Sequence, residues 1–162
     1  MEHGALADGV AAAMMALEQS SLGVAARGSG WLYALANVSH VLGAALLVGA
    51  IASFDIQVLR RAKNVGVIAG AVTPIAAFGL VLQVTSGVVL LAADAMPVVV
   101  NPAFQFKMAM LAVGLINIAA FRWRFGRHLQ ADAPLDGAMW FAALGLASWL
   151  LVLLAGRFIA YL

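Results

Sequence analysis

Four long apolar stretches constrain this chain more than any other feature, because each is long enough to cross a lipid bilayer as a helix. They cover residues 31–59, 67–92, 102–121 and 138–160. A hydrocarbon core of about 30 Å needs about 20 helical residues. None of the stretches alternates apolar and polar residues as the strands of a transmembrane barrel do. We therefore predict an all-α integral membrane protein.

The composition agrees with lipid as the solvent. Hydrophobic residues make up 65 % of the 162 residues, and the mean hydropathy is +1.03. Charged residues make up 10 % of the chain, against about 25 % in soluble domains. Cysteine is absent, which excludes disulfides, thiolate metal sites and thiol catalysis.

The connections between the stretches predict how the helices are arranged. They are short, so consecutive helices should be antiparallel neighbours in a four-helix bundle. Basic residues stay on the cytoplasmic side of a membrane. Six of the nine basic residues follow the first and third stretches: Arg60, Arg61, Lys63, Arg122, Arg124 and Arg127. We therefore expect a multi-pass protein of the bacterial inner membrane with both termini on the periplasmic side.

The first 30 residues form a separate N-terminal segment, which precedes the bundle of residues 31–162. This segment is too polar to span a bilayer, yet Leu6, Val10, Met14 and Leu17 fall near one helical stripe. Such a pattern is typical of an interfacial helix that lies on the outer leaflet. A short helix that packs on the bundle would show the same stripe.

His40 is the clearest candidate for a functional residue, because ionisable side chains at membrane depth are rare. It lies about 13 Å below the outer edge of its span at 1.5 Å per residue. Gly43 and Ala44 follow at helical spacing and leave a shallow recess beside the imidazole. The recess suits a flat ligand such as a porphyrin. It suits close packing of a neighbouring helix equally well.

Two cations belong to the same outer half of the predicted bundle. Lys107 lies in the first turns of the third span, and Arg157 lies near the end of the fourth. Both side chains can snorkel to the headgroups. Alternatively, they neutralise an anionic group beside His40, such as the propionates of a haem.

The second span carries a stripe of small and polar residues on one face, namely Gly79, Gln83, Ser86 and Gly87. We interpret the stripe as a packing seam, with Gln83 as a further candidate for cofactor binding. Asp55 and Asn117 belong to the cytoplasmic half, where we expect an ion pair of Asp55 with Arg60 or Arg122. His128 follows the third span in a basic connection, where we expect it to be solvated.

The order of these motifs is that of known families. The runs "WLYALANVSHVLGAALLVGAIASFDIQVLRR", "TPIAAFGLVLQVTSGVVLL", "NPAFQFKMAMLAVGLINIAAFR" and "AGRFIAY" together resemble an uncharacterised bacterial family of small four-helix membrane proteins. More distantly, the chain resembles the HemJ-type protoporphyrinogen oxidases, with a histidine in the first helix and a lysine opening the third. It also resembles the copper-resistance protein D group, which shares the lysine-led helix.

The resemblance to the HemJ-type proteins implies roles for individual residues. It implies that His40 is an axial ligand of haem b and that Lys107 is its functional partner and a candidate catalytic residue. Pro74 and Gly79 match the pattern of the second helix. The N-terminal extension and the "AGRFIAY" ending depart from that group, so the resemblance implies a shared haem scaffold more directly than a shared oxidase activity.

Three functions follow as hypotheses. The first is a b-type haem protein that carries out electron transfer or redox chemistry with a periplasmic or membrane partner. The second is a copper-handling permease, because thioethers suit Cu(I), although the seven methionines are scattered along the chain. The third is a cofactor-free accessory subunit of a larger complex or a homo-oligomer. No pattern indicates nucleic-acid binding, and enzymatic activity is left open.

Overall fold

The computed structural model describes residues 2–130 and 135–161, and these residues form only helices and turns. The seven helices are α1 (Glu2–Gln19), α2 (Ser21–Gly28), α3 (Gly30–Leu59), α4 (Val65–Ala93), α5 (Ala95–Val100), α6 (Pro102–Gln130) and α7 (Ala138–Phe158). Four of them, α3, α4, α6 and α7, are long and apolar enough to cross a membrane. The all-α membrane class predicted from the sequence agrees with this architecture.

The predicted spans differ from the observed helices mainly at the connections. Helix α6 continues through the "RWRFGRHLQ" segment to Gln130, where we expected a loop. Phe125 explains the continuation, because it is buried one turn beyond Phe121 and extends the apolar face of the helix. The connection at residues 94–102 also contains a short helix, α5.

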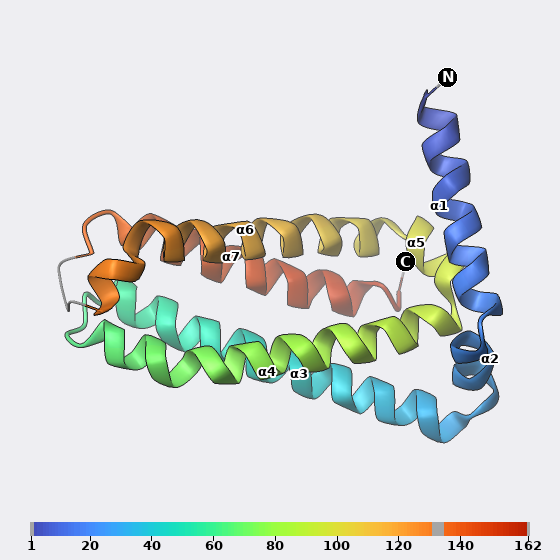
Figure 1. Ribbon diagram of the computed structural model, residues 1–162, viewed down its shortest axis with the longest axis horizontal. Coiled ribbons are helices and arrows are strands. Elements are labelled where there is room, and N and C mark those ends of the chain that lie inside the picture. Colours follow the sequence, from blue (N-terminus) through green and yellow to red (C-terminus); the bar gives the residue numbers. More distant parts are fainter. Residues whose placement is uncertain (1, 131–134, 162) are drawn as a thin grey trace.

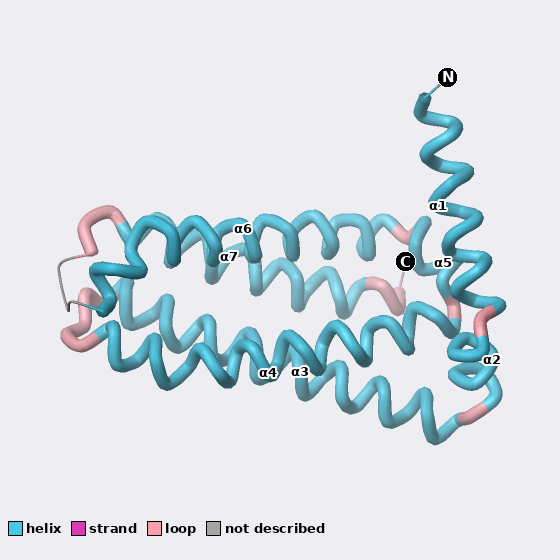
Figure 2. Tube along the Cα trace, in the orientation of Figure 1, coloured by secondary structure: helices cyan, strands magenta, loops and turns pink. Residues whose placement is uncertain are grey.

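The four long helices lie side by side along the longest axis of the molecule (Figures 1 and 2). The turn between α3 and α4 lies at one end, which we call the turn end. Helices α2 and α5 lie at the other end, which we call the α5 end (Figure 1). Helix α3 packs mainly on α4 and α7, and α6 packs mainly on α7, whereas α4 and α6 share few contacts. The bundle is therefore loosest between α4 and α6.

Apolar clusters hold the bundle together at two levels. Near the turn end, Phe121 and Phe125 pack with Val58, Val65 and alanines of α7. Phe54 and Phe141 approach Phe121 edge-on, with ring centroids 5.3 and 6.1 Å away, a favoured aromatic geometry. Midway along the bundle, Trp149 is 1 % exposed and packs with Leu47, Val48 and Ile51.

Glycines bring α3 and α4 into backbone contact. A Cβ atom added to Gly79 would lie 2.6 Å from the Leu47 nitrogen, and one added to Gly43 would lie 2.8 Å from the Gln83 nitrogen. Close approach through small residues is the main way in which helices associate in membranes. The small-residue stripe of the second span is therefore a packing seam, as predicted.

The N-terminal helices attach to the α5 end of the bundle, and α1 runs crosswise to its long axis (Figure 1). The Arg27 guanidinium donates to the carbonyl oxygens of Ala92 and Ala93 at 3.3 and 3.2 Å. These are carbonyls at the C-terminus of α4, which lack partners within the helix. The Glu18 carboxylate accepts a 3.0 Å hydrogen bond from the Met96 N–H in α5.

Candidate functional site

Three polar side chains from three helices meet near the α5 end of the bundle. His40 of α3 lies with its Nδ1 atom 3.1 Å from the Ser86 Oγ atom of α4. Its other ring nitrogen, Nε2, lies 3.5 Å from the Lys107 Nζ atom of α6. The backbones of α3 and α6 do not come close to each other, so the pair reaches across the interior of the bundle. We call these residues the His40 site.

The hydrogen bonds of Ser86 determine which ring nitrogen of His40 carries the proton. The Ser86 hydroxyl donates to the Leu82 carbonyl oxygen at 2.5 Å, so towards His40 it acts as an acceptor. The His40 Nδ1 atom is then the N–H donor, and Nε2 keeps its lone pair. An Nδ1–H held by an oxygen is the arrangement that prepares Nε2 to bind a metal or a proton.

Two glycines make room for the polar side chains. A Cβ atom on Gly87 would lie 3.1 Å from His40 Cε1, and one on Gly156 would lie 3.6 Å from Lys107 Nζ. Gly87 therefore admits the imidazole against α4, and Gly156 lets the lysine side chain pass along α7. The sequence showed Gly87 only as part of a seam and gave no signal for Gly156.

The other residues proposed for this site lie differently. The recess expected beside Gly43 is filled by the α4 backbone. Gln83 is half-buried, and its Oε1 atom has no hydrogen-bond partner among the described residues. Arg157 is exposed, and its guanidinium bonds to the Tyr161 hydroxyl and stacks 4.7 Å from the Tyr161 ring. The structure therefore brings Lys107 to His40 but leaves Arg157 at the surface.

Sequence reasoning also missed the partner that orients His40. The contact comes from a neighbouring helix: His40 Nδ1 lies 3.1 Å from the Ser86 Oγ atom of α4, whereas Asn37 of its own helix is exposed. The available signal was the depth of Ser86, because its stripe on the second span lies at the level of His40. The sequence does not show how each helix is rotated about its own axis, so it could not show that Ser86 of the second span faces the His40 ring.

A second polar cluster lies in the half of the bundle nearer the turn end. Asp55 and Asn117 are 6 % and 7 % exposed, and both approach Gly145 of α7. The Asn117 amide donates to the Phe141 carbonyl oxygen at 2.9 Å. The expected ion pair of Asp55 is not formed among the described residues: Asp55 Oδ2 has no partner, and Arg122 contacts the Thr73 hydroxyl at 3.5 Å.

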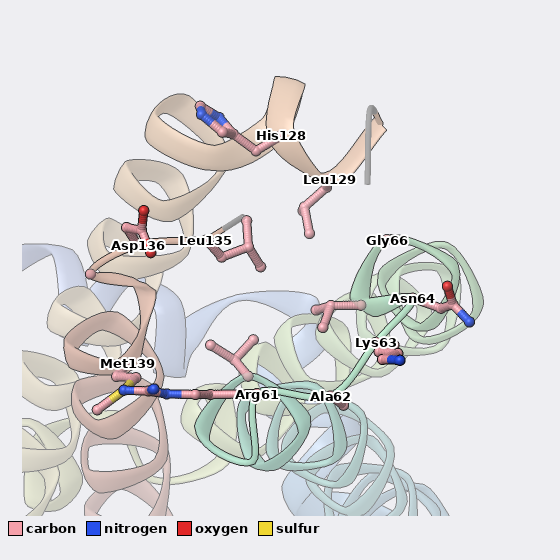
Figure 3. Close-up of a pocket in the computed structure, with 13 residues that line it drawn as sticks. Arg61, Ala62, Lys63, Asn64, Gly66, His128, Leu129, Leu135, Asp136 and Met139 are labelled. Atoms are coloured by element: carbon pink, nitrogen blue, oxygen red, sulfur yellow. The ribbon is translucent and has the colours of Figure 1, made fainter. Parts of the chain in front are cut away.

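The turn end itself holds a cavity of about 490 Å³ (Figure 3). Its lining includes Arg61, Lys63, His128 and Asp136. The Arg61 side chain extends along the cavity to Met139 (Figure 3), where its guanidinium lies 3.5 Å from the sulfur. His128 is part of α6 and half-buried, with its ring 6.1 Å from Phe125. The expectation of a solvated His128 in a loop is therefore wrong.

An imidazole nitrogen such as His40 Nε2 is a donor of the type that binds a haem iron. The space beside Nε2 is occupied by Lys107. A metal–imidazole bond is about 2.0–2.1 Å long, so the lysine must turn aside before a metal binds. Within residues 2–130 and 135–161, no cluster of three or more His, Asp or Glu side chains could hold a metal ion by itself.

Comparisons with known proteins assign no family to the chain. No family model matches it, and neither a curated protein nor a solved structure is significantly similar to it. The geometry of the His40 site therefore carries the functional argument.

Proposed function

We propose that this protein is a membrane b-type haem protein that transfers electrons near the outer face of the bacterial inner membrane. One observation carries the proposal: Ser86 fixes the Nδ1–H of His40, so the Nε2 lone pair points into the bundle interior. A histidine held in this way at membrane depth is a functional candidate.

We further propose an antiparallel bundle with both termini on the periplasmic side. Two observations support it. The basic residues of the turn end, Arg60, Arg61 and Lys63, mark the cytoplasmic side by the positive-inside rule. Helix α1 runs crosswise to the bundle (Figure 1), so a bundle that crosses the membrane would leave α1 in the plane of the outer interface.

In this proposal each residue of the His40 site has a separate task. His40 would hold the haem iron through Nε2, and Ser86 would hold the ring in position through Nδ1. Lys107 supplies a positive charge that pairs with a carboxylate of the ligand once the side chain has turned from Nε2. Bound haem would supply one-electron redox chemistry.

The visible absorption spectrum of the purified protein tests the proposal, and Lys107→Met tests the role of the lysine. We expect a Soret band in the wild type. The variant should insert into the membrane normally but bind haem about tenfold or more weakly, because a hydrogen bond to a charged group contributes about 1.5–3 kcal/mol. The measurement is Soret absorbance per protein after titration with haem.

Lys63→Met is the matched control, since Lys63 is exposed in the turn between α3 and α4. Equal haem binding by the wild type and Lys107→Met would show that the lysine has no role in retention. A colourless wild type that binds Cu(I) would support the copper permease instead. A colourless wild type that co-purifies with a larger complex would support the accessory subunit.

Ser86→Ala tests whether the orientation of the ring matters. Without its acceptor the Nδ1–H is unpaired and the ring can turn, and loss of such an outer-shell partner typically costs about 10–100-fold in metal affinity. We expect a loss of about tenfold in haem affinity, measured by the same titration. Thr85→Ala is the control, because Thr85 is exposed and bonds only to its own helix. Equal losses of haem affinity in Ser86→Ala and Thr85→Ala would contradict the role of Ser86 in orienting the His40 ring.

A further inference from the structure

A second cavity lies towards the turn end, and its lining residues on α3 begin at Leu47 and end at Asp55, about 10 to 22 Å along the helix from His40 at 1.5 Å per residue. Its volume is about 240 Å³. Four helices line it: Leu47, Ile51, Phe54 and Asp55 of α3; Ala69, Val72, Thr73, Ala76, Ala77 and Leu80 of α4; Leu115, Asn117, Ile118, Phe121, Arg122 and Leu129 of α6; and Gly145 of α7. We call it the lateral cavity, because it occupies the loose side of the bundle between α4 and α6.

The lateral cavity communicates with the lipid-facing surface. Ala77 and Leu115 line it and are also exposed on the outside of the bundle. A molecule dissolved in the hydrocarbon region can therefore enter between α4 and α6 without crossing the packed α3–α4 seam.

Two side chains that line this cavity each have a buried oxygen atom that lacks a hydrogen-bond donor. These atoms are Asp55 Oδ2 and Asn117 Oδ1, and neither has a partner in the described chain. Buried polar atoms in native proteins are nearly always paired. The Asn117 amide nitrogen is already bonded to Phe141, so its oxygen is the free atom. The terminal torsion of an aspartate is soft, so either carboxylate oxygen of Asp55 can turn towards the opening.

The chemistry of the lining limits what can supply those donors. Apart from Asp55, Asn117, Thr73 and Arg122, the lining side chains are apolar. The Arg122 guanidinium contacts the Thr73 hydroxyl, and neither group is bonded to the two oxygens. A bare Ca²⁺ or Mg²⁺ ion needs about six or more oxygen ligands, and two free oxygens do not provide them. An apolar molecule with a donor group at one end matches both the walls and the oxygens.

We propose that the lateral cavity is a second ligand site, which takes a small hydrophobic molecule with a hydroxyl or amine head group held by Asp55 and Asn117. The site shares no residue with the His40 site and does not depend on haem. A colourless protein would leave this proposal intact.

Photolabelling of the full-length protein in lipid nanodiscs tests the proposal. The probe is a para-alkylphenol with a diazirine in its chain, and the control probe is its methyl ether, which has the same apolar body but no donor. We expect the phenol to label the lining of α4 and α6 several-fold more than the ether does. Asn117→Leu and Asp55→Leu should reduce phenol labelling to the level of the ether.

Matched variants separate the site from a general loss of fold. Asn37→Leu, at an exposed position on α3, should label as the wild type does. Ala76→Phe fills the cavity from α4 without replacing a polar atom, so it should abolish labelling by both probes. It tests the location even if Asp55→Leu fails to fold.

Competition identifies the head group. Unlabelled para-butylphenol or para-butylbenzylamine should displace the probe, and the stronger competitor shows whether the site prefers a neutral hydroxyl or a cationic amine. Equal labelling by phenol and ether would overturn the proposal, because the cavity would then accept any apolar body. Unchanged labelling in Asn117→Leu and Asp55→Leu would also overturn it.

Discussion

Replacing His40 with alanine should remove the Soret band of the purified protein. Among the histidines of the described bundle helices, His40 is the one in the half nearer the α5 end, and Lys107 lies beside its Nε2 atom. We expect haem affinity to fall by more than the roughly 10–100-fold that loss of an outer-shell partner causes. The measurement is absorbance per protein after purification and after titration with haem.

His128→Ala provides the matched control, since His128 belongs to α6 and lines the cavity at the turn end, away from His40. It should leave the spectrum unchanged. Far-UV circular dichroism should show equal helix content in both variants, because neither removes a backbone contact. A Soret band that persists in His40→Ala, or disappears in His128→Ala, would overturn the assignment of the ligand.

Replacing Gly79 with leucine should destabilise the bundle strongly. The Cβ atom alone would lie 2.6 Å from the Leu47 nitrogen and 2.9 Å from the Gly43 carbonyl oxygen. Both neighbours are backbone atoms of α3, so the helices must separate to admit the side chain. Overpacking typically costs about 1–3 kcal/mol, and we expect about 3 kcal/mol or more here. The measurement is the free energy of unfolding from titration with sodium dodecyl sulfate in mixed micelles.

Gly70→Leu is the control for this variant, because a Cβ atom on Gly70 meets nothing within 4 Å. Both glycines lie in α4, so the gain in helix propensity is the same in the two variants. Separation of α3 from α4 also moves Ser86 away from His40, so Gly79→Leu should lose haem as well as stability. Equal stability of the two variants would contradict the close approach at Gly79.

The fold was more predictable than the site. Each apolar stretch is a local property of the chain, so the spans of α3 and α4 follow from hydropathy within a few residues. The error at α6 arose because "RWRFGRHLQ" is polar in composition, although Phe125 within it is buried. Composition alone does not show which side of a helix continues the core.

The site required contacts between helices. His40 and Lys107 were identified because charge at membrane depth is rare, and that signal needs no partner. Gly43 was assigned to the same site by its helical spacing from His40, and Arg157 was assigned by its depth. In the structure Gly43 faces the α4 backbone and Arg157 is exposed. The depth of a side chain along the bundle follows from its position in the sequence. The direction in which it points depends on how its helix is rotated about its own axis.

The sequence by itself determined the solvent, the number of spanning segments and the depth of each polar side chain, because these depend on hydropathy and on the fixed rise of an α-helix. Only the tertiary structure decided that Ser86 orients His40, that Lys107 reaches it across the bundle, and that Asp55 and Asn117 share a cavity. Those contacts join residues 46 to 67 positions apart at the His40 site. They arise from the rotation and close packing of whole helices, which no local pattern specifies.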